Sequence, residues 1–170
     1  MKASDYVAQW LKTKVDFVFG VTGGAAVHLF DSCHQIGPTP IYCHHEQAAG
    51  FAAVAYARIK GFGVCITTTG PAASNALTPL LGAWQDSIPV LFISGQARST
   101  QLSYYTQKRQ VGSQEAPMIS VVNKIANYSA FVDKPEFLKQ MLESAYACAM
   151  NGRQGPAWLE ICVDIQWQNV

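Results

Sequence analysis

Charged residues are scarce in this chain of 170 residues. Asp, Glu, Lys and Arg together make up 14% of it, against about 25% in an average soluble domain. The net charge is +1 and the Lys and Arg residues form no cluster, which argues against nucleic acid as a partner. No apolar run reaches the roughly 18 residues of a transmembrane helix, so no membrane partner is expected. The shortage of charge indicates a surface that other domains or a second subunit cover.

Paired cysteine and metal-binding motifs are also absent. The five cysteines include no CxxC pair, and this odd number of unpaired thiols favours buried, reduced side chains and a cytoplasmic location. The two adjacent histidines, in His44-His45-Glu46, lack the HExxH spacing that places two ligands on one helix face. We therefore expect no metal site in this chain.

What the chain does have is an alternation of apolar runs and helical segments. Alternating units of this kind predict one domain over residues 1–170, a three-layer α/β/α fold with a six-stranded, mostly parallel sheet and helices on both faces. The expected strands are Val15–Val21, Thr39–His44, Val64–Thr68, Pro89–Ser94, Ile125–Val132 and Ala157–Val163. The expected helices run to about residue 13 from a cap at Ser4 or Asp5, and over about 25–35, 46–60, 76–85, 117–122 and 135–150.

The carboxyl edge of such a sheet is where ligands bind, at a switch in strand order. Four segments leave strands there: Thr22-Gly23-Gly24, His45-Glu46, Thr69-Gly70-Pro71 and the loop after Ser94. Within that long loop, Gly112-Ser113-Gln114-Glu115 is polar and contains a glycine. We expect this edge to carry any functional site. The segment Gly112 to Glu115 is either a contact for a substrate or cofactor or a surface loop without a function, and the sequence does not favour one over the other.

The segment after Tyr42 is the most unusual in the chain. Between Gln47 and Ala57 no residue is charged, and seven of these eleven residues are Ala or Gly. A surface helix normally shows a charged face, so we expect the helix 46–60 to be buried on nearly every side. Glu46 stands at its start. Its carboxylate either stabilises the helix dipole or, because it is poorly solvated, holds a proton for chemistry.

A set of motifs, in order along nearly the whole chain, resembles the thiamine-diphosphate-dependent enzymes of the acetolactate synthase group. The motifs are Gly23-Gly24, His45-Glu46-Gln47-Ala48-Ala49, Ala55-Tyr56-Ala57-Arg58, Thr69-Gly70-Pro71 with Asn75, Trp84-Gln85-Asp86-Ser87-Ile88-Pro89, Ser94-Gly95-Gln96, Gln114-Glu115, Lys124 and Gly152 to Leu159. As a set they are specific, whereas each alone is weak. The resemblance implies the amino-terminal, pyrimidine-binding domain of such an enzyme.

The resemblance implies roles for individual residues. Glu46 matches the glutamate that hydrogen-bonds N1′ of the aminopyrimidine ring, so that C2 of the thiazolium can lose its proton and attack a 2-oxo acid. Gln114 matches a glutamine that reaches the reaction centre. The residues implied to line the cofactor are Gly23, Gly24, Glu46, Thr69, Gly70, Pro71 and Asn75. The implied products of this chemistry are those of decarboxylation, carboligation or C–C cleavage.

The resemblance also implies parts that this chain lacks. The group binds diphosphate and Mg²⁺ through a Gly-Asp-Gly motif in a separate carboxy-terminal domain, and no Gly-Asp-Gly occurs here. We therefore expect the chain to be one domain or one subunit of a larger enzyme, with little activity alone. It would pair with a diphosphate-binding domain and form a homodimer or tetramer through helix 46–60. Whether FAD binds stays open, since its site would lie outside this domain.

Two positions depart from the family pattern and keep other functions open. Ala72 stands where Gly-Pro-Gly is usual, so the turn must accept a Cβ atom, and Ser113 replaces the aromatic residue that often precedes the Gln-Glu pair. One alternative is a non-catalytic binding or regulatory module that keeps the fold. Another is the small subunit of a split 2-oxo acid decarboxylase.

Overall fold

The computed structural model describes all 170 residues and contains one six-stranded sheet. Its strands are β1 (Phe17–Gly20), β2 (Thr39–Tyr42), β3 (Gly63–Thr67), β4 (Val90–Gln96), β5 (Tyr128–Val132) and β6 (Ala157–Cys162), in the spatial order β2-β1-β3-β4-β6-β5. Every neighbouring pair is parallel. All six predicted strands are confirmed, and the sheet is parallel throughout rather than mostly parallel.

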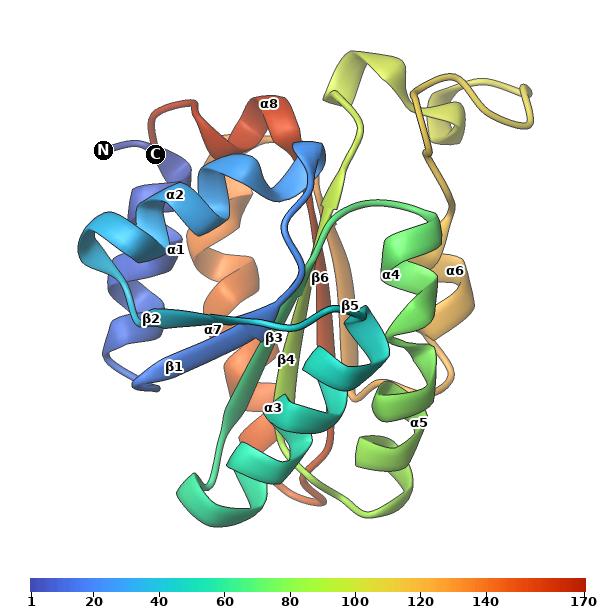
Figure 1. Ribbon diagram of the computed structural model, residues 1–170. Coiled ribbons are helices and arrows are strands. Elements are labelled where there is room, and N and C mark those ends of the chain that lie inside the picture. Colours follow the sequence, from blue (N-terminus) through green and yellow to red (C-terminus); the bar gives the residue numbers. More distant parts are fainter.

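Helices cover both faces of the sheet, which confirms the three-layer α/β/α architecture (Figure 1). One layer holds α1 (Ala3–Lys12), α2 (Val27–Ile36), α7 (Leu138–Met150) and the short α8 (Val163–Gln166); the other holds α3 (Glu46–Lys60), α4 (Pro71–Asn75), α5 (Leu77–Gln85) and α6 (Met118–Val122). Four 3₁₀ turns complete the set: η1 (Gly24–Ala26), η2 (Ser99–Gln101), η3 (Ser103–Tyr105) and η4 (Pro135–Phe137). No helix is both long and apolar enough to cross a bilayer.

The core is divided in two by the sheet. A cluster of 28 buried residues lies under α1, α2 and α7, and a second cluster of 14 lies under α3 to α6. Strand β4 serves both clusters because successive side chains point to opposite faces: Leu91 and Ile93 belong to the larger cluster, Val90 and Phe92 to the smaller. This explains why β4 is apolar at consecutive positions.

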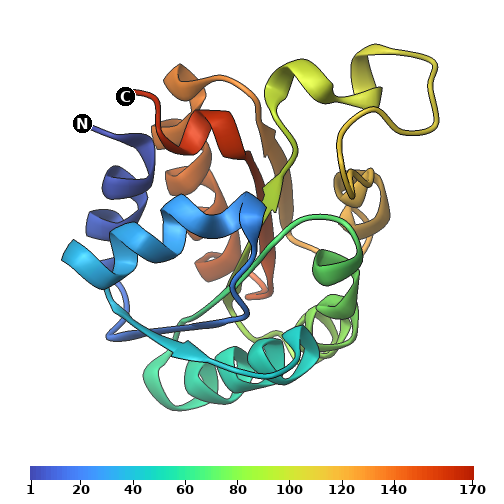
Figure 2. The same ribbon diagram turned by 45° about the horizontal axis from the view of Figure 1, so that its top comes forward.

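The strand order reverses between β1 and β3. From β1 the chain moves outward to β2, and it then returns to place β3 on the other side of β1. The segments after β1 and after β3 therefore leave the same edge of the sheet in neighbouring positions, as the switch-point rule requires for a ligand site. The view of Figure 2 shows the segment after β4, residues 97–116, extending beyond the helices at this edge.

Helix α3 begins and ends where the sequence predicts, at Glu46 and Lys60. The His45 side chain accepts a hydrogen bond from the Gln47 N–H as the cap, and Gly61 ends the helix in the left-handed conformation with φ 87°. The prediction that α3 is buried on nearly every side is wrong for the single chain, because Ala48, Phe51, Ala55 and Ile59 are exposed along one face of the helix. That face is apolar, which is unusual for a helix facing water.

The segment 69–75 is predicted as a turn, but most of it forms α4. Gly70 precedes this helix and Pro71 occupies its first turn, where the missing N–H of proline costs no hydrogen bond. Helix α5 is separate because Pro79 lies in its first turn. A proline ring in a continuous helix would clash with the carbonyl four residues earlier, that of Asn75. The short α8 is not predicted.

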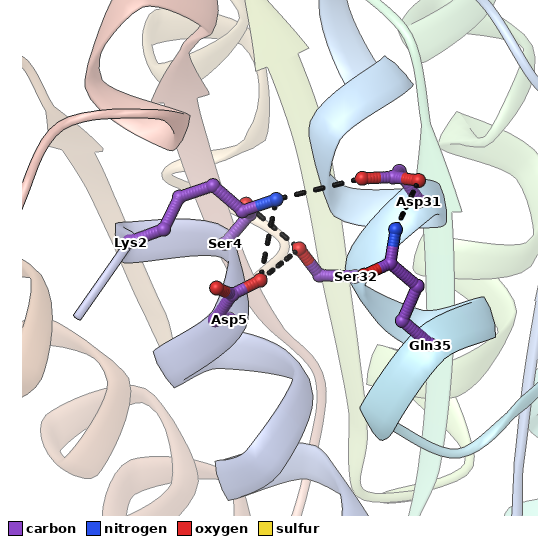
Figure 3. A network of polar contacts seen from close by, with 6 residues as sticks. All are labelled: Lys2, Ser4, Asp5, Asp31, Ser32 and Gln35. Carbon is purple, nitrogen blue, oxygen red and sulfur yellow. Dashed lines mark hydrogen bonds and ion pairs between the residues drawn. The ribbon is translucent and has the colours of Figure 1, made fainter.

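The cap predicted at Ser4 or Asp5 is also wrong. Helix α1 begins at Ala3 without any side-chain cap, and both residues bond to α2 instead (Figure 3). Ser32 Oγ lies 2.9 Å from Ser4 Oγ and 2.7 Å from Asp5 Oδ1, and Lys2 Nζ lies 3.2 Å from Asp5 Oδ1. These polar side chains therefore join two helices rather than begin one.

The cysteines form no disulfide. Cys33, Cys65 and Cys162 are buried as expected, whereas Cys148 is exposed and Cys43 half-buried. Burial raises the pKa of the Cys33 thiol to about 12, so this thiol stays protonated and acts as a small core residue.

Candidate functional site

Glu46 and Asn75 form a hydrogen-bonded pair at the carboxyl edge of the sheet. Asn75, the last residue of α4, donates from Nδ2 to Glu46 Oε2 over 2.9 Å. The Glu46 residue is 9% exposed, and this is the one hydrogen bond that its side chain makes. A nearly buried carboxyl with acceptor capacity left over can bind a donor from a ligand. The structure thus brings together two of the predicted site residues that are 29 positions apart.

A cavity of about 260 Å³ opens at the same edge of the sheet, but neither Glu46 nor Asn75 lines it. Three predicted site residues line it, namely Gly24, Thr69 and Gln114, from the segments after β1, β3 and β4. A Cβ added to Gly24 would meet no atom within 4 Å, so that glycine leaves open space for a ligand. Gly23 is packed differently, because its Cβ would come 2.6 Å from the Thr68 side chain. Pro71 is exposed.

The Gly70 turn and the Gln114 loop touch each other. A Cβ at Gly70 would lie 1.8 Å from the Gln114 carbonyl oxygen, and Gly70 has φ 56°, a region that L-residues rarely adopt. Gln114 itself has φ 57°, which costs about 1–3 kcal/mol in a residue with a side chain. Strain retained at a cavity wall is typical of functional sites. The contact shows that a glycine is required at position 70.

The two departures from the family pattern lie at different depths in this site. Ala72 belongs to the first turn of α4 and is half-buried, so the helix accepts its Cβ in an ordinary conformation. Ser113 is exposed and lines the 260 Å³ cavity beside Gln114. The turn therefore accepts the Cβ of Ala72, whereas Ser113 leaves room where an aromatic ring would stand.

Two other motifs do not join the site. In the first, Asp86 forms an ion pair with Arg58 at the end of α5. In the second, Arg153 Nε donates to Ser87 Oγ over 2.9 Å. These contacts precede β4 and β6, so they lie at the amino edge of the sheet, opposite the cavity. Their role in this chain is to fix the connections at that edge.

Several residues at the site are missed by the sequence reasoning. Gln96, the last residue of β4, lines both the 260 Å³ cavity and a second cavity of about 340 Å³. Its amide bonds to Glu160 on β6, which is 2% exposed and lines the second cavity. Thr68 Oγ1 accepts a hydrogen bond from the Ala25 N–H over 3.1 Å. A polar residue at the end of an apolar strand, for Gln96, and a charged residue inside one, for Glu160, are the signals that could have revealed these two.

Glu115 organises the loop that carries Gln114. Its Oε1 accepts from the N–H and hydroxyl of Ser103, and its Oε2 accepts from the N–H groups of Val111 and Gly112. Desolvation by burial favours a higher pKa for Glu115, but these hydrogen bonds outweigh it and lower the pKa below its usual value. The predicted single helical turn in this loop is in fact two 3₁₀ turns, η2 and η3.

Glu160 is a buried acid to which we assign no role in ligand binding. Its burial, followed by the nearby charge of Glu115, raises the pKa of the Glu160 carboxyl from 4.5 to about 8, although hydrogen bonds with Gln96 and Ser94 act in the opposite direction. The folded chain therefore holds a proton that the unfolded chain releases above about pH 4.5. The contribution of Glu160 to stability should therefore fall as the pH rises through this window, up to about pH 8.

Glu160→Gln should remove that loss of stability. The substitution keeps the shape and an oxygen acceptor for Gln96 but carries no charge, so the variant should exceed the wild type at pH 9 by on the order of 3–5 kcal/mol and equal it near pH 4. Urea unfolding at several pH values measures the difference. Glu136→Gln, at an exposed position on η4, is the control and should follow the wild type. Parallel pH curves for Glu160→Gln and the wild type would contradict the burial argument.

The geometry of the fold and the comparisons with known proteins both indicate a ligand-binding domain. A parallel α/β sheet with a cavity at its switch point defines a ligand-binding domain of the doubly wound class. Residues 1–121 match the family described as thiamine pyrophosphate enzyme, N-terminal TPP binding domain. This chain belongs to that family.

Similar proteins include large subunits of acetolactate synthases. The chain is 35% identical over 168 residues to the acetolactate synthase isozyme 2 large subunit of Escherichia coli (strain K12), covering 98% of this chain and 30% of that protein. It is 35% identical over 153 residues to the acetolactate synthase large subunit of Corynebacterium glutamicum, covering 89% and 24%. It is 30% identical over 168 residues to a probable acetolactate synthase large subunit of Methanocaldococcus jannaschii, covering 98% and 27%. The chain thus spans less than a third of the length of these relatives.

The site fits one part of thiamine diphosphate. Glu46 offers acceptor capacity. The cavity at the same edge of the sheet, which Glu46 does not line, is open at Gly24 and has polar side chains at Thr69 and Gln114, which suits a small heteroaromatic ring with hydrogen-bonding groups. No group of three or more His, Cys, Asp or Glu residues is arranged to hold a metal ion. These acceptor and donor groups suit a ring that carries hydrogen-bonding groups, such as an aminopyrimidine.

Proposed function

We propose that this chain is the pyrimidine-binding domain of a thiamine-diphosphate-dependent, acetolactate synthase-like enzyme that acts on a 2-oxo acid. The observation that carries the proposal is the nearly buried Glu46 carboxyl at the switch-point edge, bonded only to Asn75. When bound, thiamine diphosphate supplies a nucleophilic carbon and an electron sink for the 2-oxo acid. The protein supplies orientation and one proton.

In this proposal Glu46 holds a proton at the ring nitrogen N1′ of the aminopyrimidine. The Asn75 amide holds one oxygen of the Glu46 carboxyl, which leaves the other oxygen without a hydrogen bond from this chain and able to bond to the ligand. Thr69 and Gly70 form the turn beside the ring, and Gly24 leaves the space for it. Gln114 lines the cavity from the opposite segment and would contact the 2-oxo acid. Proton positioning of this kind contributes about 10²–10⁴-fold to a reaction rate.

The remaining parts of the site would come from elsewhere. This chain has no cluster for a metal ion, so Mg²⁺ and the diphosphate would be held by a diphosphate-binding domain of the same or a partner chain. FAD, if the enzyme uses it, would also bind outside this domain. The chain would be one domain over residues 1–170 and show little activity alone. The five unbonded cysteines are typical of a reducing compartment, and we propose a cytoplasmic location.

The test of the proposed function uses the complete protein that contains this chain. Calorimetry with thiamine diphosphate and Mg²⁺ should show binding, and CO₂ release or carboligation should follow with pyruvate or another 2-oxo acid. Binding without turnover of any 2-oxo acid would favour the alternative, a non-catalytic module. Absence of binding would contradict the proposal, including its variant as the small subunit of a split 2-oxo acid decarboxylase.

The exposed face of α3 supports self-association into a dimer or tetramer. Phe51 and Ile59 on α3 are 47% and 82% exposed, and Leu81 and Trp84 on the adjoining α5 are 39% and 42% exposed. Exposed apolar side chains gathered on two packed helices are typical of protein interfaces. We propose that this face packs against a second subunit, burying about 1,600 Å² or more in total.

Phe51→Glu should weaken this association. A charge in the centre of an apolar interface costs about 2 kcal/mol or more, so the dissociation constant measured by sedimentation should rise at least about thirtyfold. Phe137→Glu is the matched control, because Phe137 is 41% exposed on η4, which precedes α7 in the opposite layer. Equal sedimentation of both variants and the wild type would contradict the assignment of the interface to α3.

A further inference from the structure

Gln96 lies where three segments of the site meet. It is 2% exposed, and its side-chain amide makes four hydrogen bonds. Its Oε1 accepts from Thr69 Oγ1 and from the Ala97 N–H, each over 2.8 Å. Its Nε2 donates to the Ala116 carbonyl and to Glu160 Oε1, each over 3.0 Å. The hydrogen-bonding capacity of this amide is therefore fully used.

The orientation of the Gln96 amide follows from these partners. The Ala97 N–H can only donate and the Ala116 carbonyl can only accept, so a flipped amide would lose both bonds. A buried polar group that loses its partners costs about 1–3 kcal/mol. The side chain is thus held in one position, and it holds Thr69 and Ala116 in turn.

The two segments that Gln96 joins are those that touch at the cavity. Thr69 precedes Gly70, and Ala116 follows Gln114 by two residues. The backbones of Gly70 and Gln114 are so close that no Cβ fits between them. Gly70 also precedes α4, the helix that ends at Asn75, the partner of Glu46. A shift at Thr69 would therefore be passed through α4 to the Glu46 pair.

We propose that Gln96 is a positioning residue that holds the Gly70 turn and the Gln114 loop in register through its bonds to Thr69 and Ala116. The Gln96 amide bonds to protein groups rather than to the proposed ligand, so it acts on the site through these two segments. An effect of Gln96 on catalysis rests on the proposed function, but the structural coupling of the two segments does not.

The coupling can be measured without any cofactor, by hydrogen–deuterium exchange of the complete protein. The Ser74 N–H, bonded to the Gly70 carbonyl, reports on the turn, and the Met118 N–H, bonded to the Ala116 carbonyl, reports on the loop. Gln96→Met keeps the length of the side chain and removes all four bonds. Exchange should accelerate at least about tenfold in peptides covering 69–76 and 112–118, while β3 and β6 stay protected.

Gln166→Met is the matched control. Gln166 is fully buried, and its Nε2 donates to the carbonyls of Ala25 and Ile161, so the same substitution removes an equally buried amide from another segment. It should accelerate exchange near Ala26 and leave 69–76 and 112–118 unchanged. If Gln96→Met accelerates exchange evenly over the whole protein, or in only one of the two segments, the proposal is overturned.

A second variant keeps the proposal testable if Gln96→Met does not fold. Thr69→Val preserves the shape of the side chain and removes one bond to Gln96, so exchange should accelerate in 69–76 and stay unchanged in 112–118. Unchanged exchange in 69–76 would overturn the proposal. In an active complete protein, Gln96→Met should also lower kcat at least about tenfold more than Gln166→Met does for an equal loss in Tm. Since the exchange data need no cofactor, a protein that fails to bind thiamine diphosphate would overturn the proposed function and leave this inference standing.

Discussion

Glu46→Gln should lower the rate at which the hydrogen on thiazolium C2 exchanges with solvent by at least about 100-fold in the complete protein. The substitution keeps the size of the side chain and an oxygen that can accept from Asn75 Nδ2. What it removes is a carboxyl group able to hold a proton at N1′ of the aminopyrimidine. Cofactor affinity should change much less than the exchange rate, because the cavity and the Asn75 contact remain.

The control for this variant is Glu136→Gln, which makes the same chemical change at an exposed position on η4. It should exchange C2 hydrogen at the wild-type rate. Quenched-flow deuterium exchange read by NMR supplies the measurement. A Glu46→Gln rate within threefold of the wild type would leave the carboxylate with its structural role at the start of α3 and no role in proton transfer.

Gly70→Ala should damage both stability and cofactor binding. An alanine there must adopt φ 56° and place a Cβ 1.8 Å from the Gln114 carbonyl oxygen. Since the obstacle is backbone rather than a flexible side chain, the turn or the Gln114 loop has to move. We expect a loss of roughly 2–4 kcal/mol in the free energy of unfolding. In the complete protein, affinity for thiamine diphosphate should fall at least about tenfold, because both displaced segments flank the cavity.

Gly61→Ala is the control that separates the cost of a positive φ from the cost of a steric clash of the new Cβ atom. Gly61 also has a positive φ, 87°, but a Cβ there meets no atom within 4 Å, and it ends α3 far from the cavity. This variant should lose only about 1 kcal/mol and bind cofactor normally. Urea unfolding and calorimetric titration measure the two effects. If Gly70→Ala were no more destabilised than Gly61→Ala, the close approach of the Gly70 turn to Gln114 would be wrong.

Much of the fold follows from local features of the sequence. Helix α3 ends at Gly61, a signal that is visible in the sequence, whereas its cap, His45, is not one of the usual capping residues and is shown only by the structure. The strands are continuous apolar runs because helices cover both faces of a parallel sheet. The position of Glu46 at the carboxyl edge of the sheet also follows, since this edge is fixed once the strands alternate with helices.

The parts that sequence reasoning misses depend on distant contacts. Gln96 bonds to residues 27 and 64 positions away, and no local pattern at the end of β4 reveals those partners. Glu160 interrupts an apolar strand, and its burial depends on β6 lying between β4 and β5. The exposure of one face of α3 is not predicted for another reason. A helix of small apolar residues has the same sequence pattern whether its own chain or a partner covers it, so the pattern does not show which face is exposed.

The most direct test of the central claim, that Glu46 binds the aminopyrimidine and holds a proton at its ring nitrogen, is ¹⁵N NMR of thiamine diphosphate labelled at N1′ and bound to the complete protein. The N1′ resonance should move from its position in the free cofactor toward that of a protonated or strongly hydrogen-bonded nitrogen. In Glu46→Gln it should return toward the free value while the cofactor stays bound. An N1′ resonance that is the same in the wild type, in Glu46→Gln and in the free cofactor would contradict the claim.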